Sequence, residues 1–286
     1  MTILEVIQRS ADYLAKHGVD SARLQSELLL AHVLRVPRMR LYLEFQRLLA
    51  EPELAALREL VKRRGRREPL QHLVGSVSFC GFELAVNHHV LVPRPETEQL
   101  AEAAWSFLST PDQQAPIALD LCTGSGCLAI ALAMKCPRVV IHAADLSPEA
   151  LTVARANVER HGAAARVTFH EGDLFAPLPV ELKFDLIVSN PPYIPTGEIA
   201  VLEPEVRDHD PRAALDGGGD GLVFYRRIAT EGASRLRSGG RLMVEFGDGQ
   251  AEALQRLFTS SGWQVREILS DLDGRLRIMI ASVVGS

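Results

Sequence analysis

The sequence has 286 residues, of which 47% are hydrophobic and 23% are charged, and its net charge is −5. This length suggests about two domains, with a core large enough to fold without disulfide or metal cross-links. The composition excludes a disordered chain, a fibrous repeat and a disulfide-rich miniprotein. The charge is uneven, because residues 1–70 carry 13 Lys and Arg against 9 Asp and Glu, while the remainder carries an acidic excess.

Cysteine spacing and the N-terminal segment bear on the cellular compartment. None of the four cysteines has a C-x-x-C neighbour or a histidine at a zinc-finger interval, so we expect reduced thiols and no metal site. Charged side chains interrupt the first twenty residues, which therefore lack the apolar core of a signal peptide. No apolar run approaches the length of a membrane span. The expectation is a cytoplasmic protein that does not bind membranes.

Residues 1–66 have the pattern of a small helical bundle. Apolar residues recur at helical spacing over 3–14 and again over 24–34. We expect Ser21 to cap the second of these helices and Pro37 to end it. A further helix is expected from about Pro52 to Arg64, with the proline in its first turn.

Two features follow this bundle. Five Lys and Arg residues lie between positions 62 and 67, and such a patch could attract RNA or an RNA-bound partner. We favour a solvated helix end, because cations also suit the C-terminal end of a helix dipole. Residues 72–92 then have the alternating pattern of a β-hairpin that turns near Cys80–Gly81 and links two halves of the chain.

From about residue 115 short apolar runs alternate with helical stretches, which predicts a doubly wound α/β sheet. The last two strands are joined by a few residues around Asp273–Gly274, so they should form an antiparallel hairpin. The expected strands are 117–121, 139–144, 167–170, 184–189, 241–246, 264–269 and 276–282. The expected helices are 126–135, 148–161, 222–236 and 249–261.

The first strand of this sheet ends in a turn suited to approach a ligand. Glycine lets the backbone come close to a bound molecule, and the N-terminus of the following helix offers free amides. The turn lacks the third glycine of the dinucleotide fingerprint and has no lysine, so a pyrophosphate fits it poorly. Its candidate cofactor-binding residues are Asp120, Cys122, Thr123, Gly124, Ser125 and Gly126.

Acidic residues also follow the next two strands. Asp145 stands 19 residues after Gly126, where a carboxylate can hold both hydroxyls of a ribose, although it could also cap the helix that begins near Ser147. Asp173 follows the third strand and could accept a hydrogen bond from an adenine amino group, with Leu174 packing near the ring. Acidic residues after three successive strands fit a ligand that carries an amine, a ribose and an adenine.

The fourth strand ends in the motif that points to a reaction, Asn190, Pro191, Pro192 and Tyr193. Substrates bind at the carboxyl ends of strands in open α/β sheets. The two prolines stiffen the loop, and an NH₂ group could donate one hydrogen to the Asn190 side chain and the other to the Pro191 carbonyl. Tyr193 could stack on the planar amide. The alternative is an ordinary proline-rich turn with a buried tyrosine.

This motif and the glycine turn together resemble the S-adenosylmethionine-dependent methyltransferases that act on planar exocyclic or amide nitrogens. Segments 68–75, 91–98 and 216–222 narrow the resemblance to the release factor glutamine methyltransferases of the PrmC type, over nearly the whole chain. The chain departs from many methyltransferases at Cys122, where they have the first glycine of the turn. This form is also similar to the sister family that methylates a glutamine of a large-subunit ribosomal protein, but segment 91–98 favours the release-factor branch.

The resemblance implies a seven-stranded methyltransferase sheet with a terminal antiparallel hairpin and a small N-terminal helical bundle. Residues 1–70 would recognise the substrate, 71–92 would be the hairpin linker and 93–286 would form the methyltransferase domain. Residues 93–97 would border the methionine end of the cofactor or the substrate, or would simply start a helix. The expected cofactor is S-adenosylmethionine and the expected protein is a monomer.

The resemblance also implies the reaction. A methyl group would pass to the side-chain amide nitrogen of the glutamine in the Gly-Gly-Gln loop of class I peptide chain release factors, with Asn190, Pro191 and Tyr193 as catalytic residues. One rival is a nucleic-acid amino-methyltransferase, which the acidic α/β half disfavours because DNA binding draws on Lys and Arg contacts. Others are the ribosomal-protein methyltransferase and a non-enzymatic RNA-associated module.

Overall fold

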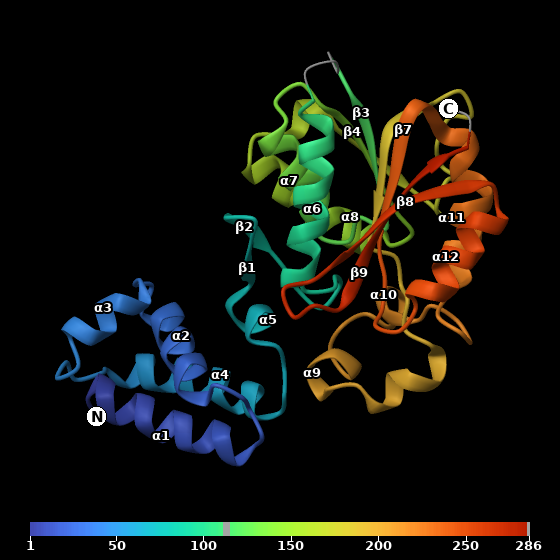
Figure 1. Ribbon diagram of the computed structural model, residues 1–286. Helices are drawn as coiled ribbons and strands as arrows, with labels where there is room; N and C mark the ends of the chain where they lie inside the picture. Colours follow the sequence, from blue (N-terminus) through green and yellow to red (C-terminus); the bar gives the residue numbers. More distant parts are fainter. Residues whose placement is uncertain (111–114, 285–286) are drawn as a thin grey trace. The chain divides into compact units, whose positions relative to one another are not determined.

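The computed structural model describes residues 1–110 and 115–284, which form two compact units (Figure 1). The first unit consists of Met1–Ser76 and Leu202–His209, and the second of Val77–Val201 and Asp210–Ser286. Segment 202–209 therefore packs with the N-terminal bundle, although the alternating pattern of the sequence places it among the strands and helices of the second half. Each unit has its own apolar core.

The first unit is helical. Thr2 starts its first helix with a capping box: its hydroxyl accepts from the backbone N–H of Glu5, whose carboxylate accepts from the Thr2 N–H. Buried faces of the longer helices, with residues such as Leu14, Leu29 and Leu57, form the core. The helices are α1 (Ile3–Lys16), α2 (Ala22–Leu34), α3 (Arg38–Leu43), α4 (Glu51–Gly65), α5 (Leu70–Val74) and α9 (Pro204–Arg207).

Two expectations for this unit are wrong. Ser21 precedes α2 but has a left-handed backbone, φ 49°, and its side chain makes no capping hydrogen bond. The helix ends at Leu34, before Pro37, because Arg35 turns into the left-handed conformation. A serine before an apolar stretch predicts a cap only if its backbone is extended, which the sequence does not reveal.

The basic run 62–67 is a set of ion pairs and only partly a solvated helix end. Arg64 is 4% exposed, and its guanidinium donates to Glu205 at 2.7 Å. Arg67 donates to the same carboxylate at 2.6 Å, and Arg63 to Glu68 at 2.8 Å. The sequence showed the cations but not their partners, because Glu205 is distant along the chain. Lys62 and Arg66 remain exposed.

The predicted hairpin is shorter than expected. Strands β1 (Ser76–Phe79) and β2 (Phe82–Ala85) flank a turn at Cys80 and Gly81, both with positive φ, so the turn is confirmed. Residues 72–74 belong instead to helix α5, which Gly75 ends in the left-handed conformation.

The second unit contains a seven-stranded sheet in the order β5-β4-β3-β6-β7-β9-β8. The pairs from β5 to β7 are parallel, and β9 is antiparallel to both β7 and β8, so the predicted terminal hairpin is confirmed. The strands are β3 (Ile117–Leu121), β4 (Val140–Asp145), β5 (Val167–Glu171), β6 (Phe184–Ser189), β7 (Leu236–Glu245), β8 (Trp263–Ser270) and β9 (Leu276–Val283).

Helices cover both faces of the sheet, because alternate residues of the central strands point to opposite sides. Ala118 and Leu186 pack with α6 and α7, whereas Leu119 and Ile187 pack with α11 and α12 (Figure 1). The helices of this unit are α6 (Pro95–Leu108), α7 (Cys127–Lys135), α8 (Pro148–Arg160), α10 (Arg212–Leu215), α11 (Val223–Gly232) and α12 (Ala251–Ser260), with short 3₁₀ turns η1 (Ala164–Arg166), η2 (Thr196–Val201) and η3 (Ala233–Arg235).

The largest differences between expected and observed boundaries in this unit lie at the end of α11 and the start of β7. Strand β7 begins at Leu236 and not at Arg241, and α11 ends four residues earlier than predicted. A Cβ on Gly240 would lie 3.0 Å from the Phe184 carbonyl oxygen, and the register with β6 shifts here. The close approach explains the glycine. Within residues 1–110 and 115–284, no helix combines the length and apolar character that crossing a membrane requires.

Candidate active site

The candidate site lies at the carboxyl ends of the central strands. Strand β3 is flanked by β4 on one side and β6 on the other, so the chain order reverses beside it. Such a switch point leaves a crevice where open α/β sheets bind their ligands. Ser189 at the end of β6 donates through its hydroxyl to the Leu121 carbonyl at 2.8 Å, which joins the two strand ends.

The turn after β3 uses positive φ at three positions. Cys122 has φ 61°, the conformation that glycine adopts without strain, and Gly124 and Gly126 follow with 54° and 80°. The Cys122 position therefore keeps the glycine-type backbone although its side chain departs from the glycine of many methyltransferases. A Cβ on Gly124 would meet no atom within 4 Å, so the space over this part of the turn is open to a ligand.

Asp120, at the end of β3, holds the turn through two hydrogen bonds. Its Oδ2 accepts from the Thr123 hydroxyl at 2.6 Å and from the Ala129 N–H, in the first turn of α7, at 3.1 Å. The Oδ1 atom is buried and has no hydrogen-bond partner among the described residues. Burial raises the pKa of this carboxyl to about 7, and the nearby Asp145 acts in the same direction. The free oxygen can accept from a cationic group of a bound ligand.

Asp145 joins the turn to the end of β4. Its two oxygens accept from the backbone N–H groups of Gly124 at 2.8 Å and Ser147 at 3.0 Å. The Ser147 hydroxyl accepts from the Ala150 N–H at 3.1 Å, so Ser147 and not Asp145 caps α8. Burial raises the Asp145 pKa above its ordinary value. Each carboxylate oxygen has a second lone pair, so each can also accept a hydrogen bond from a ribose hydroxyl.

Asp173 and Leu174 differ in their exposure. Both Asp173 oxygens accept from Arg227 Nη1, at 2.7 and 2.8 Å, in a half-exposed ion pair. Leu174 has φ 48° and is 4% exposed, packed in the core beside Phe175. Their predicted roles toward an adenine stay predictions, and a ligand that bound Asp173 would share it with Arg227.

The loop after β6 is rigid because distant segments hold it. Pro191 and Pro192 are buried, and no donor to the Pro191 carbonyl is found in the described part of the chain. Tyr193 is half-buried, and its carbonyl accepts from the Gln250 side chain at 2.9 Å. Desolvation raises the Tyr193 pKa to about 12, with Glu245 acting in the same direction, so the phenol is neutral at pH 7.

The glycine-rich segment 216–222 packs against this loop. Ile194 exchanges backbone hydrogen bonds with Leu215 and Gly217, at 3.0 and 2.9 Å. A Cβ on Gly217 would lie 2.8 Å from Tyr193 Cα, and a Cβ on Gly221 would overlap the Tyr193 carbonyl oxygen. These glycines are required because two backbones approach without room for a side chain. The motif therefore supports the Asn190–Tyr193 loop from behind.

Asn190 lies at the start of a buried polar network. Its Nδ2 donates to the Thr97 hydroxyl at 3.1 Å, and that hydroxyl donates to Glu245 Oε2 at 2.7 Å. Thr97 and Glu245 are each 2% exposed. Burial raises the Glu245 pKa to about 7, Glu96 raises it further, and Thr97, Arg277 and Asn190 act against this.

Glu245 was not among the residues expected at the site, and Thr97 was expected only within segment 93–97, either to border the methionine end of the cofactor or the substrate, or to start a helix. Thr97 is the third residue of α6, so segment 93–97 does start a helix, and it also delivers a hydroxyl to Asn190. A signal for Glu245 existed, since an acidic residue ends an otherwise apolar strand run. A buried carboxylate needs hydrogen-bond partners, and when none is close along the chain they must come from distant segments of the fold.

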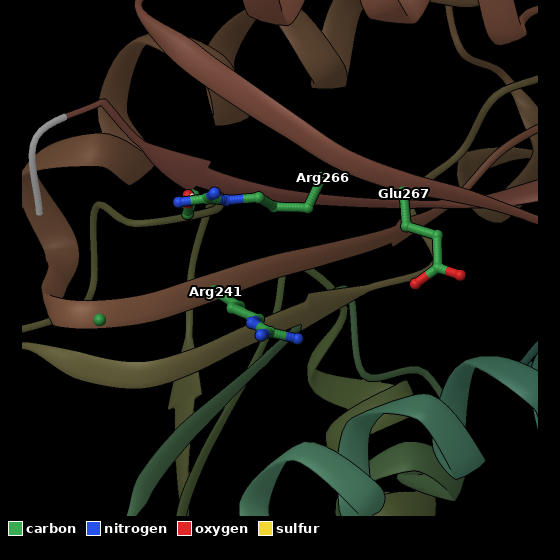
Figure 2. A pocket seen from close by; sticks show the side chains of 5 residues that line it. Arg241, Arg266 and Glu267 are labelled. Carbon is green, nitrogen blue, oxygen red and sulfur yellow. The ribbon is translucent and has the colours of Figure 1, made fainter.

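A second hollow lies at the other end of β7. It has a volume of about 370 Å³ and is lined by Gly239, Arg241, Arg266, Glu267 and Ser282 (Figure 2). Arg266 donates to the Ser282 hydroxyl at 2.9 Å, and the Arg241 guanidinium lies 4.6 Å from the Phe107 ring centroid. Both cations are therefore engaged within the fold, away from the strand ends that carry the candidate residues.

Comparisons with known proteins agree with this architecture. Residues 5–75 match the family model "PrmC N-terminal domain", and residues 99–206 match "Methyltransferase small domain". The chain is 48% identical to the release factor glutamine methyltransferase of Geobacter sulfurreducens, over 92% of this chain and 90% of that protein. It is 40% identical to the protein of that name from Chlorobaculum tepidum, over 97% of each. The chain belongs to the release factor glutamine methyltransferase family.

The fold agrees with this family assignment. A methyltransferase from Pyrococcus furiosus superposes with a TM-score of 0.52 at 20% identity, over 77% of this chain and 97% of that structure, which shows a shared fold. As a member of this methyltransferase family, the chain uses S-adenosylmethionine as its methyl donor. The residues present fit that group: the space over Gly124 is open, and Asp120 keeps a buried oxygen with unused acceptor capacity.

Proposed function

We propose that this chain transfers a methyl group from S-adenosylmethionine to the side-chain amide nitrogen of the glutamine in the Gly-Gly-Gln loop of class I release factors. The observation that carries the proposal is the position of the Asn190–Tyr193 loop. It follows β6 directly beside the turn that follows β3, with Leu121 and Ser189 in register. A planar amide and a nucleoside donor can therefore meet at one crevice. The choice of release factors as the substrate rests on the names of the relatives.

The chemical difficulty is that an amide nitrogen is a poor nucleophile, because its lone pair is delocalised into the carbonyl. When bound, S-adenosylmethionine supplies a methyl group on a positively charged sulfur, a strong electrophile. The Asn190 side-chain oxygen and the Pro191 carbonyl would accept the two amide hydrogens. Two acceptors stabilise the positive charge that grows on nitrogen as the N–C bond forms and the S–C bond breaks.

Positioning supplies the rest of the acceleration. The loop cannot relax easily, since Pro191 and Pro192 are stiff and Gln250 holds the Tyr193 carbonyl. Well-oriented reactions can gain up to about 7–11 kcal/mol from fixed geometry. Tyr193 stays a neutral phenol and would stack on the flat amide. The methylated nitrogen then loses a proton to water, so no side chain is assigned as a general base.

On the cofactor side, the turn Cys122–Gly126 and Asp145 would bind the nucleoside. Asp145 would accept the ribose hydroxyls while it holds Gly124, and Asp120 would accept from the ammonium end. Asp173 and Leu174 would line the adenine, in competition with Arg227 for the Asp173 carboxylate. Thr123 and Ser125, which are buried, would shape the turn from within.

We further propose that residues 1–70 recognise the substrate, that 71–92 link the halves and that 93–286 carry out the transfer. A substrate that acts in translation places the reaction in the cytoplasm. We propose that the protein is a monomer. We also propose that it does not bind DNA, because the chain outside residues 1–70 is acidic. The glutamine of a large-subunit ribosomal protein is the second candidate substrate, on the resemblance of the turn that contains Cys122.

The test is incubation with methyl-labelled S-adenosylmethionine and, in parallel, a purified class I release factor, large-subunit ribosomal proteins and DNA. Label should enter the release factor alone, and mass spectrometry should place it on the loop glutamine. The matched control is a release factor with that glutamine replaced by glutamate, which should take no label. Labelling of a ribosomal protein in preference to the release factor would contradict the proposal.

A further inference from the structure

The buried network behind Asn190 determines which end of its amide faces the substrate. An asparagine side chain presents an acceptor on one side and a donor on the other, and the two ends have nearly the same shape. The predicted chemistry needs the acceptor, because the substrate NH₂ can only donate. A reversed amide would set two donors against each other.

The elements of the network come from three parts of the chain. Ser189 and Val244 are paired in the parallel β6–β7 ladder, so the next residues, Asn190 and Glu245, stand at the same level of the sheet. Thr97 enters between them from the first turn of α6. The Tyr225 hydroxyl donates to the Glu245 carbonyl at 2.6 Å and fixes the end of β7.

The number of available protons decides which group donates and which accepts in each hydrogen bond of this network. Above its pKa of about 7, Glu245 is ionised and has no proton to donate, so it can only accept. The single Thr97 proton therefore goes to Glu245, at 2.7 Å, and the Thr97 oxygen is left to accept. The atom of Asn190 that faces it at 3.1 Å must then be the NH₂ group. Asn190 also lowers the pKa of the Glu245 carboxyl, as expected if its NH₂ group, and not its carbonyl oxygen, is on the side of the carboxylate.

We propose that Thr97 and Glu245 are positioning residues that hold the Asn190 amide with its carbonyl oxygen toward the substrate nitrogen. This inference rests on the proposed function, because it assigns a purpose to the orientation of Asn190 in that reaction. Neither residue touches the substrate. They act through Asn190: Thr97 accepts from its Nδ2, and Glu245 accepts the Thr97 proton.

The first test replaces the Thr97 hydroxyl. Thr97→Val keeps the shape but removes the polarity, and the freed amide can reverse. We expect kcat to fall about ten- to hundredfold, because a reversed amide no longer accepts a hydrogen bond from the nitrogen on which charge develops. Calorimetry should show an unchanged dissociation constant for S-adenosylmethionine. Thr97→Ser restores the hydroxyl and should keep kcat within about threefold. Thr230→Val, an exposed helical threonine, is the matched control.

A second readout does not need activity. The chain has three asparagines, Asn87, Asn157 and Asn190, so selective ¹⁵N-asparagine labelling gives three side-chain NH₂ groups in an NMR spectrum. The pair of NH₂ signals that disappears in Asn190→Asp belongs to Asn190. In Thr97→Val the Asn190 pair should shift and exchange faster with water, while the Asn157 pair, which donates to Ala85 and Ser125, should stay in place and report an intact fold.

A double-mutant cycle separates the network from independent effects. Thr97→Val combined with Glu245→Gln should lower kcat no more than Thr97→Val alone, because both act through one hydrogen bond. Wild-type kcat in Thr97→Val, or a Thr97→Ser protein as impaired as Thr97→Val, would overturn the inference. If the wild-type protein binds S-adenosylmethionine but does not methylate release factors, the proposed function fails. An unchanged Asn190 resonance in Thr97→Val would still overturn the network by itself.

Discussion

The turn that follows β3 and the loop that follows β6 lie at neighbouring strand ends but are held in different ways. Residues 120–126 are held by short-range bonds, such as those from Asp120 to Thr123 and Ala129, and by Asp145 from the next strand. Asn190 and Tyr193 are held by groups from α6, β7, the 216–222 segment and Gln250. A local turn keeps its shape when one contact is lost, whereas the loop depends on several distant segments.

The largest effect is expected at the loop itself. Asn190→Ala removes the acceptor for the amide hydrogen and should lower kcat by about a hundred- to a thousandfold. The cofactor turn is not touched, so the affinity for S-adenosylmethionine should stay close to that of the wild type. Methyl-transfer kinetics and calorimetry on the same preparation measure both. Turnover at the wild-type rate would refute the assigned role of Asn190.

A pair of glycine substitutions compares the two regions directly. Gly221→Ala places a Cβ on the Tyr193 carbonyl at φ 73°, so it combines overlap with backbone strain. We expect a loss of about 3–5 kcal/mol in the free energy of unfolding, or a displaced loop with little activity. Gly124→Ala also has positive φ, 54°, but its Cβ meets no atom, so it should cost about 1 kcal/mol. Equal losses in urea unfolding would remove the distinction between the regions.

The buried carboxyl of Glu245 predicts a dependence of stability on pH. Its folded pKa, about 7, lies above its ordinary value of 4.5, so the native state binds the proton more tightly. The stability that this group contributes is present below pH 4.5 and is lost as the pH rises through 7. Glu245→Gln does not titrate, so relative to the wild type it should gain about 3 kcal/mol in unfolding free energy between pH 4.5 and 8. A difference that stays constant with pH would contradict the raised pKa.

The smallest effect is expected on the cofactor side. Asp145→Ala removes an acceptor for the ribose and the bond to Gly124, and should weaken S-adenosylmethionine binding about ten- to thirtyfold, with a smaller effect on kcat at saturating cofactor. Asp173→Ala should weaken it less, because Asp173 is half-exposed and already paired with Arg227. Calorimetry measures both. An unchanged affinity in Asp145→Ala would show that the ribose assignment is wrong.

Sequence patterns predicted the elements well where the pattern depends on neighbouring residues. The strands 117–121 and 184–189 have the bounds expected, and the turn at Cys80–Gly81 is confirmed. Errors occurred where a local signal had two outcomes. Ser21 does not cap α2, and Arg64 and Arg67 of the basic run are bound to Glu205 of a distant segment. The insertion of β9 between β7 and β8 also left no local trace.

The order of strands and helices, the family and the two motifs at the sheet edge could be predicted from the residues alone, because these depend on periodicity, glycine positions and the order of residues along the chain. The hydrogen-bond partners of the Asn190 amide, in contrast, are set by the folding of distant segments. Thr97 and Glu245 are 93 and 55 positions away from it along the chain. Hydrogen-bond partners that meet only through sheet register and helix packing have no fixed spacing in sequence, so their contribution could be seen only once the chain was folded.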